Sequence, residues 1–359
     1  MMNSVFSNLL ILFCSHYVEN SCLNIVKEIK ANTRSVKIQA YVGEQNDYSS
    51  QTLRKIKRKA KLLEVPGFHE YSLPTFARDV ALPLDSKHLL YLPYKEIFSV
   101  FKPFFSVLKS KSNITPLAPS LDDLRLLRSW RKIRGRDNPF NRAFTKKNFL
   151  RGGNFRVFPR YKVVLMGTRK ITPGEKAELE TFFDQHDLTL RFVNLPNLGV
   201  GHLDEVFNII ESQKSCHFKV LVADPEKAFH ILGKDNIEDF ETYSFVRHAM
   251  SSIRSATFDL EQTLSSLDKD CKVDFYSIPV FWNAEALPER ANAVNGLVLE
   301  GKYFYSLPYS IKEPNEKMFR ALKSATESAL QKVGFKDIIG IDTREYDRLR
   351  GNLHCATLN

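Results

Sequence analysis

Four short stretches of the sequence carry side chains that could take part in chemistry. They are "TFARDVALP" with Asp79, "LRGGNFRVF" with Asn154, "GVGHLDEVF" with His202 and Asp204, and "GNLHCATLN" with Cys355. A cysteine thiolate is a nucleophile, a histidine can move protons near neutral pH, and aspartates can hold a cation. Taken singly, each stretch is weak, because Gly-Gly-Asn is usually a turn and an isolated cysteine is usually a buried filler.

The order of these stretches is more specific than any one of them. Arg-Asp, Gly-Gly-Asn, Gly-His-x-Asp-Glu and a late His-Cys-x-Thr follow one another in a way that resembles the guanidine-modifying (pentein) superfamily. "GHLDE" and "NAVNGLVLEG" (292–301), followed by "GNLHCATLN", look most like the catalytic domain of protein-arginine deiminases. "FARD" and the Gly-Gly-Asn stretch are nearer to agmatine deiminases and bacterial peptidyl-arginine deiminases. The resemblance spans essentially the whole chain.

The resemblance implies an α/β fold of a particular kind. It is the pentein α/β-propeller, in which five strand–helix units surround a pseudo-fivefold axis and the site lies in the central depression. No Pro/Gly/Ser-rich linker divides the chain, so we expect one catalytic domain over residues 1–359, with a basic insertion at about 100–151.

The resemblance also implies a role for each side chain. A guanidinium is planar and always charged, and its N–H groups match carboxylates on two sides. The implied carboxylates are Asp79 and Asp204, and Cys355 is the implied nucleophile at the guanidinium carbon. His202 then resembles the acid–base residue, which protonates departing ammonia and afterwards activates water. No cofactor and no metal are implied.

Three further residues near these motifs have weaker implied roles. Asn154 and Asn295 resemble positions that line the substrate pocket, and a turn role is an equal alternative for both. His354 adjoins Cys355, but in an extended segment neighbouring side chains point to opposite faces, so we expect a structural role for it. By the same period, His202 and Asp204 would share one face of an extended segment.

The sequence departs from the family pattern beside the pocket. Deiminases of free arginine and agmatine usually carry Glu before Gly-Gly, whereas this chain has Arg151 there. A cation beside a guanidinium pocket would repel the substrate, which favours peptidyl-arginine as the substrate. Only Asp79 and Asp85 lie in "TFARDVALPLD", too few oxygen ligands for a hard cation, so calcium activation is not expected.

Composition and net charge indicate which partners and which cellular compartment to expect. The formal net charge is +11, with 52 basic and 41 acidic residues, which favours acidic partners. No apolar run is long enough to span a membrane, and the N-terminal "SVFSNLLILFCSH" suits a buried strand better than a signal peptide. The five scattered cysteines predict no disulfide framework and favour a reducing compartment. We therefore expect a cytoplasmic protein, or one secreted without a recognisable signal peptide.

Hydrophobic periodicity predicts alternating strands and helices. Expected strands are 8–14, 35–43, 188–195, 218–224, 272–281, 295–308 and a final one at 337–342, with a hairpin at 154–167; expected helices are 18–31, 48–64, 173–186, 225–232, 236–266 and 313–333. Such alternation is typical of an α/β fold.

Residues 125–151 interrupt this rhythm with ten basic residues and a single acid, Asp137. Interleaved aromatics make nucleic-acid binding conceivable, whereas a solvated insertion is the favoured interpretation. Three functions therefore remain open. The first is a peptidyl-arginine deiminase acting on a protein or peptide. The second is another guanidine enzyme, namely an agmatine or arginine deiminase, a dimethylarginine hydrolase or an amidinotransferase. The third is a basic binding module without catalysis. The oligomeric state is not predicted.

Overall fold

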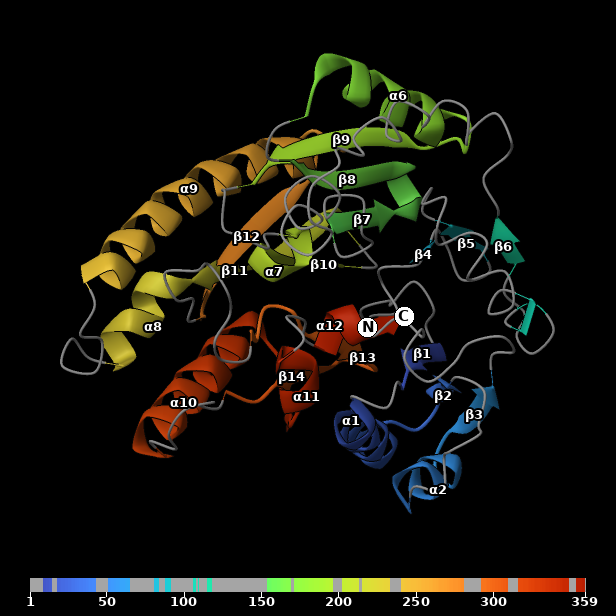
Figure 1. Ribbon diagram of the computed structural model, residues 1–359. Helices are drawn as coiled ribbons and strands as arrows, with labels where there is room; N and C mark the ends of the chain where they lie inside the picture. The colour runs from blue at the N-terminus through green and yellow to red at the C-terminus, as the bar shows by residue number, and fades with distance from the viewer. Residues whose placement is uncertain are drawn as a thin grey trace, which may run out of the picture.

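The computed structural model describes the chain in segments: 9–14, 18–42, 51–64, 81–83, 88–91, 106–107, 109, 115–117, 154–168, 171–195, 202–212, 215–232, 240–280, 292–308, 316–348 and 353–358. These residues form five small mixed sheets with helices between their strands (Figure 1). The α/β fold expected from the sequence is thus confirmed, whereas the pseudo-fivefold axis stays a prediction.

Four of the sheets have three strands and one shared topology. Their strands are β4 (Ala81–Pro83), β5 (His88–Tyr91) and β6 (Thr115–Leu117); β7 (Phe155–Phe158), β8 (Val163–Thr168) and β9 (Thr189–Asn194); β10 (Phe207–Glu211), β11 (His217–Asp224) and β12 (Lys272–Pro279); and β13 (Leu297–Leu299), β14 (Lys302–Ser306) and β15 (Ile338–Ile341). In each sheet the first strand pairs antiparallel with the second, and the second pairs parallel with the third. The described strands therefore repeat one supersecondary unit.

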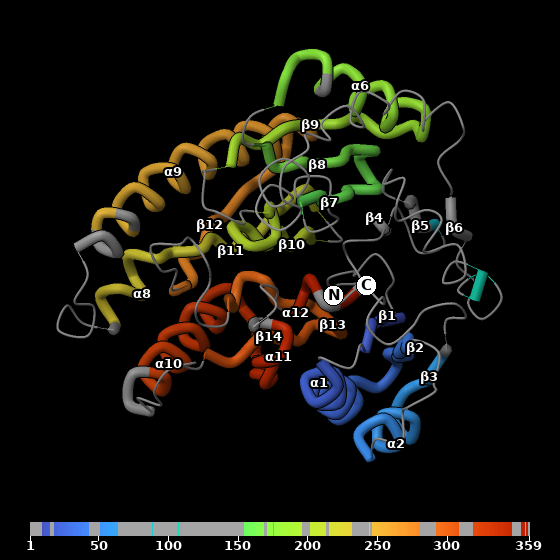
Figure 2. Tube along the Cα trace, in the orientation of Figure 1, coloured from blue at the N-terminus to red at the C-terminus, as the bar shows by residue number. Residues whose placement is uncertain are grey.

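The remaining sheet joins the two ends of the described chain. Its order is β16 (Thr357–Leu358), β1 (Leu9–Phe13), β2 (Lys37–Val42) and β3 (Lys61–Glu64). β16 runs antiparallel to β1, with Leu358 opposite Ile11, and β1 runs parallel to β2. This pairing repeats the topology of the other sheets with a strand from the far end of the sequence. Figure 2 shows α12 (Leu353–Ala356) and the end of the chain lying beside β1.

Helices connect the parallel strands, since a parallel pair needs a crossover. They are α1 (Glu19–Asn32) and α2 (Gln51–Lys57) in the first sheet, α6 (Pro173–Asp184), α8 (Pro225–Leu232), α9 (Phe240–Ser265) and α10 (Glu316–Val333). Short helices α7 (Leu203–Val206) and α11 (Arg344–Arg348) lie outside these crossovers. None of the helices in the described segments is both long and apolar enough to cross a membrane.

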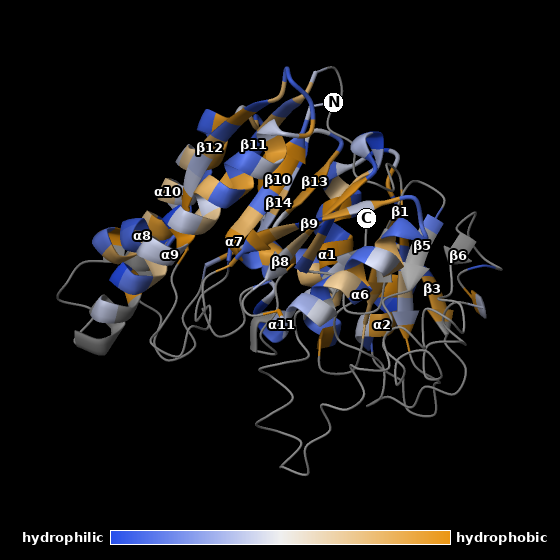
Figure 3. Ribbon diagram, turned by 90° about the horizontal axis from the view of Figure 1, so that it is seen from above, coloured by the Kyte–Doolittle hydropathy of each residue, from blue (hydrophilic) through white to orange (hydrophobic). Residues whose placement is uncertain are grey.

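Apolar side chains explain why these segments pack. Strands β1 and β8 are buried almost throughout, and a core cluster between the sheets contains Phe158, Phe218 and Tyr303, all fully buried. Figure 3 shows apolar residues concentrated on the strands and hydrophilic residues on outward turns of helices such as α8 and α9. Burial of these apolar side chains is the main favourable contribution to folding.

The predicted helix at 48–64 is wrong in its second half. α2 ends at Lys57, and Lys61–Glu64 forms β3, which pairs with β2. Leu62 and Leu63 satisfy both a helical and a strand pattern, so local periodicity does not decide between them. Pairing with β2 satisfies backbone N–H and C=O groups that an unpaired edge would leave exposed, and this tertiary contact decides the outcome.

The expectation that the cysteines stay unpaired is also wrong. Disulfides join Cys14 to Cys22 and Cys216 to Cys271, and Cys355 is the free thiol. Cys216 and Cys271 directly precede the paired strands β11 and β12, so the sheet brings together residues that lie 55 positions apart. The pairing of β11 with β12, rather than the spacing of the cysteines in the sequence, brings Cys216 and Cys271 close together. The absence of a regular cysteine spacing therefore no longer supports a reducing compartment.

Candidate active site

The candidate residues hold equivalent positions in the repeated units. Asn154 directly precedes β7, Asp204 lies shortly before β10, Asn295 before β13 and Cys355 before β16. Each of these strands is the antiparallel edge strand of its sheet. Asp79 stands two positions before β4 in the sequence and lies outside the described residues. One topological position in each unit therefore carries the residues that the sequence motifs single out.

Asp204 lies on the short helix α7, so the expected extended segment is wrong here. His202 is the N-cap residue of α7; its backbone N–H donates to Glu205 Oε2 at 3.1 Å, and the Glu205 N–H donates to the His202 carbonyl at 3.1 Å. The Glu205 side chain thus caps the start of the helix, and the backbone bond closes a helical turn that is too short to show a periodic pattern in the sequence. His202 and Asp204 are both buried. The acid–base role of His202 stays a prediction.

Asn154 holds the start of α7 in place. Its Oδ1 accepts the Leu203 N–H at 3.1 Å and its Nδ2 donates to the Gly167 carbonyl at 2.5 Å. The residue is 1% exposed, so these bonds form in a region that excludes water. Asn154 thus links β7 and β8 to the helix that carries Asp204. A direct contact with substrate stays a prediction.

Asn295 holds the helix that carries the thiol. Its Oδ1 accepts the backbone N–H groups of His354 at 3.0 Å and Cys355 at 3.2 Å. Its Nδ2 donates to the Asp204 carbonyl at 3.2 Å and to Cys355 Sγ at 3.3 Å. These contacts use the oxygen and both amide hydrogens, so the described geometry makes Asn295 the clamp between α7 and α12. A contact between Asn295 and the substrate stays a prediction.

Cys355 and Asp204 meet at this clamp. The Cys355 Sγ lies 3.8 Å from Asp204 Oδ2, and both residues are buried. The Asn295 N–H favours the thiolate, because a donor stabilises the charged form of its acceptor. The Asp204 carboxylate disfavours a second negative charge so close to it. A cation bound by Asp204 would remove that repulsion, so nucleophile and cation binding are coupled in this arrangement.

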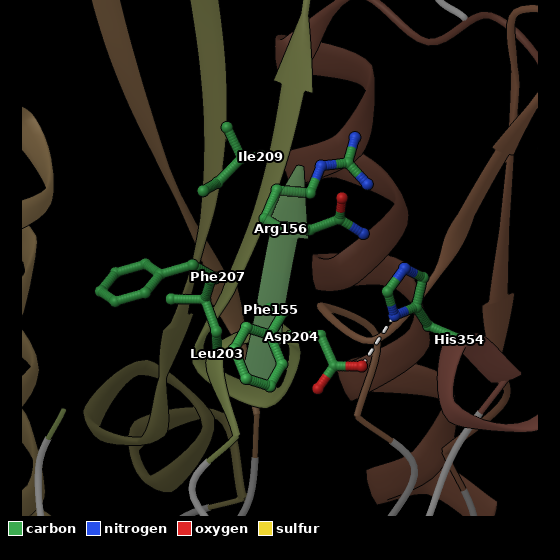
Figure 4. A pocket seen from close by; sticks show the side chains of 8 residues that line it. Phe155, Arg156, Leu203, Asp204, Phe207, Ile209 and His354 are labelled. Atoms are coloured by element: carbon green, nitrogen blue, oxygen red, sulfur yellow. Dashed lines mark hydrogen bonds and ion pairs between the residues drawn. The ribbon is translucent and has the colours of Figure 1, made fainter. Parts of the chain in front are cut away.

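His354 belongs to the same cluster, contrary to the expectation from an extended segment. Leu353–Ala356 forms α12, and the His354 Nδ1 lies 2.7 Å from Asp204 Oδ2 (Figure 4). In a helical turn, neighbouring side chains are about 100° apart rather than opposite, so both His354 and Cys355 can reach α7. A single helical turn is too short to show a period, so no local sequence signal reveals this contact.

A small cavity of about 10 Å³ opens between these residues, which is room for about one water molecule. Asp204, His354 and Arg156 line it (Figure 4). Asn208 also lines it. Burial lowers the pKa of Arg156, an effect that Glu211 opposes. Burial also raises the pKa of Glu211, which Arg156 and Arg160 oppose. Sequence reasoning missed Arg156, which alternates with buried apolar residues in β7 and carries no motif.

Several predicted features lie outside the described residues. They are Asp79, Asp85, Arg151, the two glycines before Asn154, and the basic segment 125–151. Among the residues that the structure does describe, no group of three or more His, Cys, Asp or Glu side chains could hold a metal ion.

Solved structures provide the comparison with known proteins. A chain provisionally assigned as a peptidyl-arginine deiminase is 13% identical, with a TM-score of 0.59, covering 99% of this chain and 97% of that one. The agmatine deiminase of Enterococcus faecalis is 12% identical, with a TM-score of 0.56 and coverage of 99% and 94%. An amidinotransferase of saxitoxin biosynthesis from Microseira wollei is 14% identical, with a TM-score of 0.52 and coverage of 99% and 96%.

No protein-family model and no curated protein matches the sequence. The likeness is therefore one of three-dimensional structure, at an identity too low to assign a substrate. The chain shares its fold with a deiminase of agmatine and with an amidinotransferase.

Proposed function

We propose that the protein hydrolyses a guanidinium group to a ureido group and ammonia, with Cys355 as the nucleophile. The observation that carries this proposal is the contact between Cys355 Sγ and Asp204 Oδ2, at 3.8 Å, with Asn295 bonded to both residues. A buried carboxylate beside a free thiol suits a cationic substrate that is attacked next to its charge. The fold shared with an agmatine deiminase is consistent with this chemistry.

The reaction proceeds in two steps. Asp204 and Asp79 hold the guanidinium, the Cys355 thiolate adds to its central carbon, and the C–N bond to one amino group breaks. His202 gives a proton to the departing ammonia, which leaves an amidino thioether on Cys355. Water then adds to that carbon and His202 takes one of its protons; the C–S bond breaks as the ureido C=O forms, and the remaining hydroxyl proton passes to solvent, where it converts the released ammonia to ammonium. The products are the ureido compound and the regenerated thiolate, so one water is consumed for each ammonia released.

The side chain of a peptidyl arginine is the proposed substrate. The support is Arg151, which replaces the glutamate that free-arginine and agmatine deiminases carry before Gly-Gly. A peptide substrate offers no free ammonium or carboxylate to be matched at that position. The two aspartates then suffice to hold the guanidinium.

A substrate panel tests the proposal. Purified protein is incubated with arginine-containing peptides, free arginine, agmatine and methylarginines, and ureido product and ammonia are measured. We expect product from peptides, a loss of at least about a hundredfold in Cys355→Ala and Asp204→Asn, and unchanged activity in Glu261→Gln on the exposed face of α9. Undiminished turnover in Cys355→Ala would overturn the proposal. Adding glycine distinguishes an amidinotransferase, which would form guanidinoacetate instead of ammonia.

A further inference from the structure

The contact between His354 and Asp204 has no part in the chemistry proposed above. His354 Nδ1 lies 2.7 Å from Asp204 Oδ2, and the residues are only 8% and 7% exposed. Figure 4 shows the imidazole directed at the carboxylate across the edge of the cavity. A hydrogen bond this short, between buried partners and to a charged group, is among the stronger ones in proteins.

The chemistry of the pair determines where the proton lies. An ionised carboxylate can only accept hydrogen bonds, so His354 must carry its proton on Nδ1 to make this contact. Both the neutral Nδ1–H tautomer and the imidazolium meet that condition. Each carboxylate oxygen has two acceptor sites, so Asp204 can accept from His354 and still accept the N–H groups of a guanidinium.

Contacts other than the imidazole hold α12 in position. The His354 backbone N–H bonds to Asn295 Oδ1 at 3.0 Å, and the Cys355 N–H bonds to the same oxygen at 3.2 Å. Thr357 Oγ1 also donates to the carbonyls of Leu353 and His354. Backbone and Thr357 contacts therefore anchor the helix, and the imidazole acts on Asp204.

We propose that His354 is a positioning residue, whose Nδ1–H fixes the Asp204 carboxylate in the orientation that receives the cationic end of the substrate beside Cys355. The inference rests on the proposed function and deepens it. A carboxylate is free to turn about its last torsion, which is broad and roughly twofold. Without a donor at the place of Nδ1, the Asp204 carboxylate turns away from the orientation beside Cys355 Sγ. It then binds the cationic end of the substrate less tightly.

Alkylation of Cys355 tests this without relying on turnover. The probes are 2-chloroacetamidine, whose amidinium resembles the end of a guanidinium, and neutral iodoacetamide. The ratio of the two rate constants measures how well Asp204 holds a cation next to Sγ. Asp204→Asn serves as the reference for a site without that ability, and urea denaturation of every variant shows which remain folded.

Three substitutions separate positioning from packing. In His354→Asn the amide nitrogen reaches the place of Nδ1; in His354→Gln it lies one bond further out; His354→Leu has no donor. We expect the alkylation ratio to fall about tenfold or more in the Gln and Leu variants, as for loss of a hydrogen bond to a charged group, and to stay near the wild-type value in the Asn variant. The iodoacetamide rate should change little. For the substrate that turns over, the Gln and Leu variants should raise KM more than they lower kcat.

The outcomes distinguish a failure of the proposed function from a failure of the positioning role of His354. Equal ratios in wild type and Asp204→Asn would overturn the proposed function, since Asp204 would then hold no cation. A wild-type ratio that depends on Asp204 but is the same in His354→Asn and His354→Gln would overturn the positioning role alone. Because that comparison uses two amides that differ by one methylene, it decides the matter even if His354→Leu does not fold.

Discussion

The Asn295 Nδ2 lies 3.3 Å from Cys355 Sγ, although 60 positions separate the two residues in the chain. The same amide nitrogen donates to the Asp204 carbonyl, and its oxygen accepts from the backbone of α12. One buried asparagine thus fixes the distance between the thiol and the carboxylate. In this site the spacing of the reactive groups is set by a residue that takes no part in bond making.

Asn295→Asp should therefore impair the thiol while keeping the acceptor that holds α12. The new carboxylate still accepts the His354 and Cys355 N–H groups, but it replaces the donor to Sγ and to the Asp204 carbonyl with a negative charge. We expect alkylation of Cys355 to slow at least about tenfold at neutral pH, since a hydrogen bond to a charged group contributes about 1.5–3 kcal/mol. The measurement is the rate of iodoacetamide modification against pH, which should move toward alkaline pH.

Asn292→Asp is the matched control for that substitution. Asn292 lies in the same turn, donates to the Glu205 carbonyl and accepts the Val294 N–H, and no direct contact with Cys355 is described. Its variant should lose stability but keep the wild-type pH dependence of alkylation. An identical shift in both variants would mean that the effect comes from the loop rather than from the donor at Sγ.

Gly167→Ala should displace Asn154 and, through it, the helix that carries Asp204. A Cβ at Gly167 would overlap Asn154 Oδ1 and the Leu195 side chain. Overpacking of this kind costs about 1–3 kcal/mol, and the clash falls on the oxygen that accepts the Leu203 N–H. We expect a lower urea midpoint together with a loss of turnover.

Gly174→Ala is the control for Gly167→Ala. It lies in the first turn of α6, and nothing stands within 4 Å of the Cβ that the substitution adds. Alanine is favoured over glycine inside helices, so its stability should be unchanged or slightly raised. If Gly167→Ala and Gly174→Ala had the same urea midpoint and the same turnover, close packing at Gly167 would not matter for the site.

Thr357→Val should weaken the link between β16 and α12. The Thr357 hydroxyl donates to the carbonyls of Leu353 at 3.1 Å and His354 at 3.3 Å, and valine has the same shape without the donor. We expect a loss of about 1–2 kcal/mol in unfolding free energy together with lower kcat/KM. Thr263→Val removes a similar bond to the Asp259 carbonyl in α9 and should lower stability without changing kcat/KM.

Glu300 should make stability depend on pH. Burial tends to raise the pKa of Glu300, but hydrogen bonds from the Ser35 hydroxyl and the Arg34 and Ser35 backbone N–H groups outweigh it and lower the pKa. A lowered pKa in the folded state contributes stability above the usual glutamate pKa, and this contribution is lost as pH falls through the folded value. Glu300→Gln should therefore be less stable than wild type at pH 7.

The difference in stability between Glu300→Gln and wild type should disappear on acidification, once the pH lies below the lowered folded-state pKa of Glu300 and the carboxyl is protonated in both folded and unfolded chains. Urea denaturation at a series of pH values gives the two curves. Glu261→Gln, at an exposed site on α9, should follow the wild-type curve throughout. A constant gap between Glu300→Gln and wild type at all pH values would contradict the role of the charge.

The long elements were predictable because their patterns are local. The buried run at 8–14 appears as β1, the helix expected at 225–232 matches α8, and the hairpin expected at 154–167 appears as β7 and β8. Apolar periodicity over several residues is a property of the sequence alone, and burying that face stabilises one structure over the others. The order of the chemical motifs, likewise read from the sequence, indicated the kind of fold.

The site itself was decided by contacts between distant segments. α7 and α12 are single helical turns, too short to show a period, and Asn154 and Asn295 hold them from other sheets. β16 is too short to predict and exists as a strand because β1 offers an unpaired edge. Isolated turns cost more conformational entropy than their few hydrogen bonds return. Tertiary structure therefore determined that His354 lies against Asp204 beside Cys355.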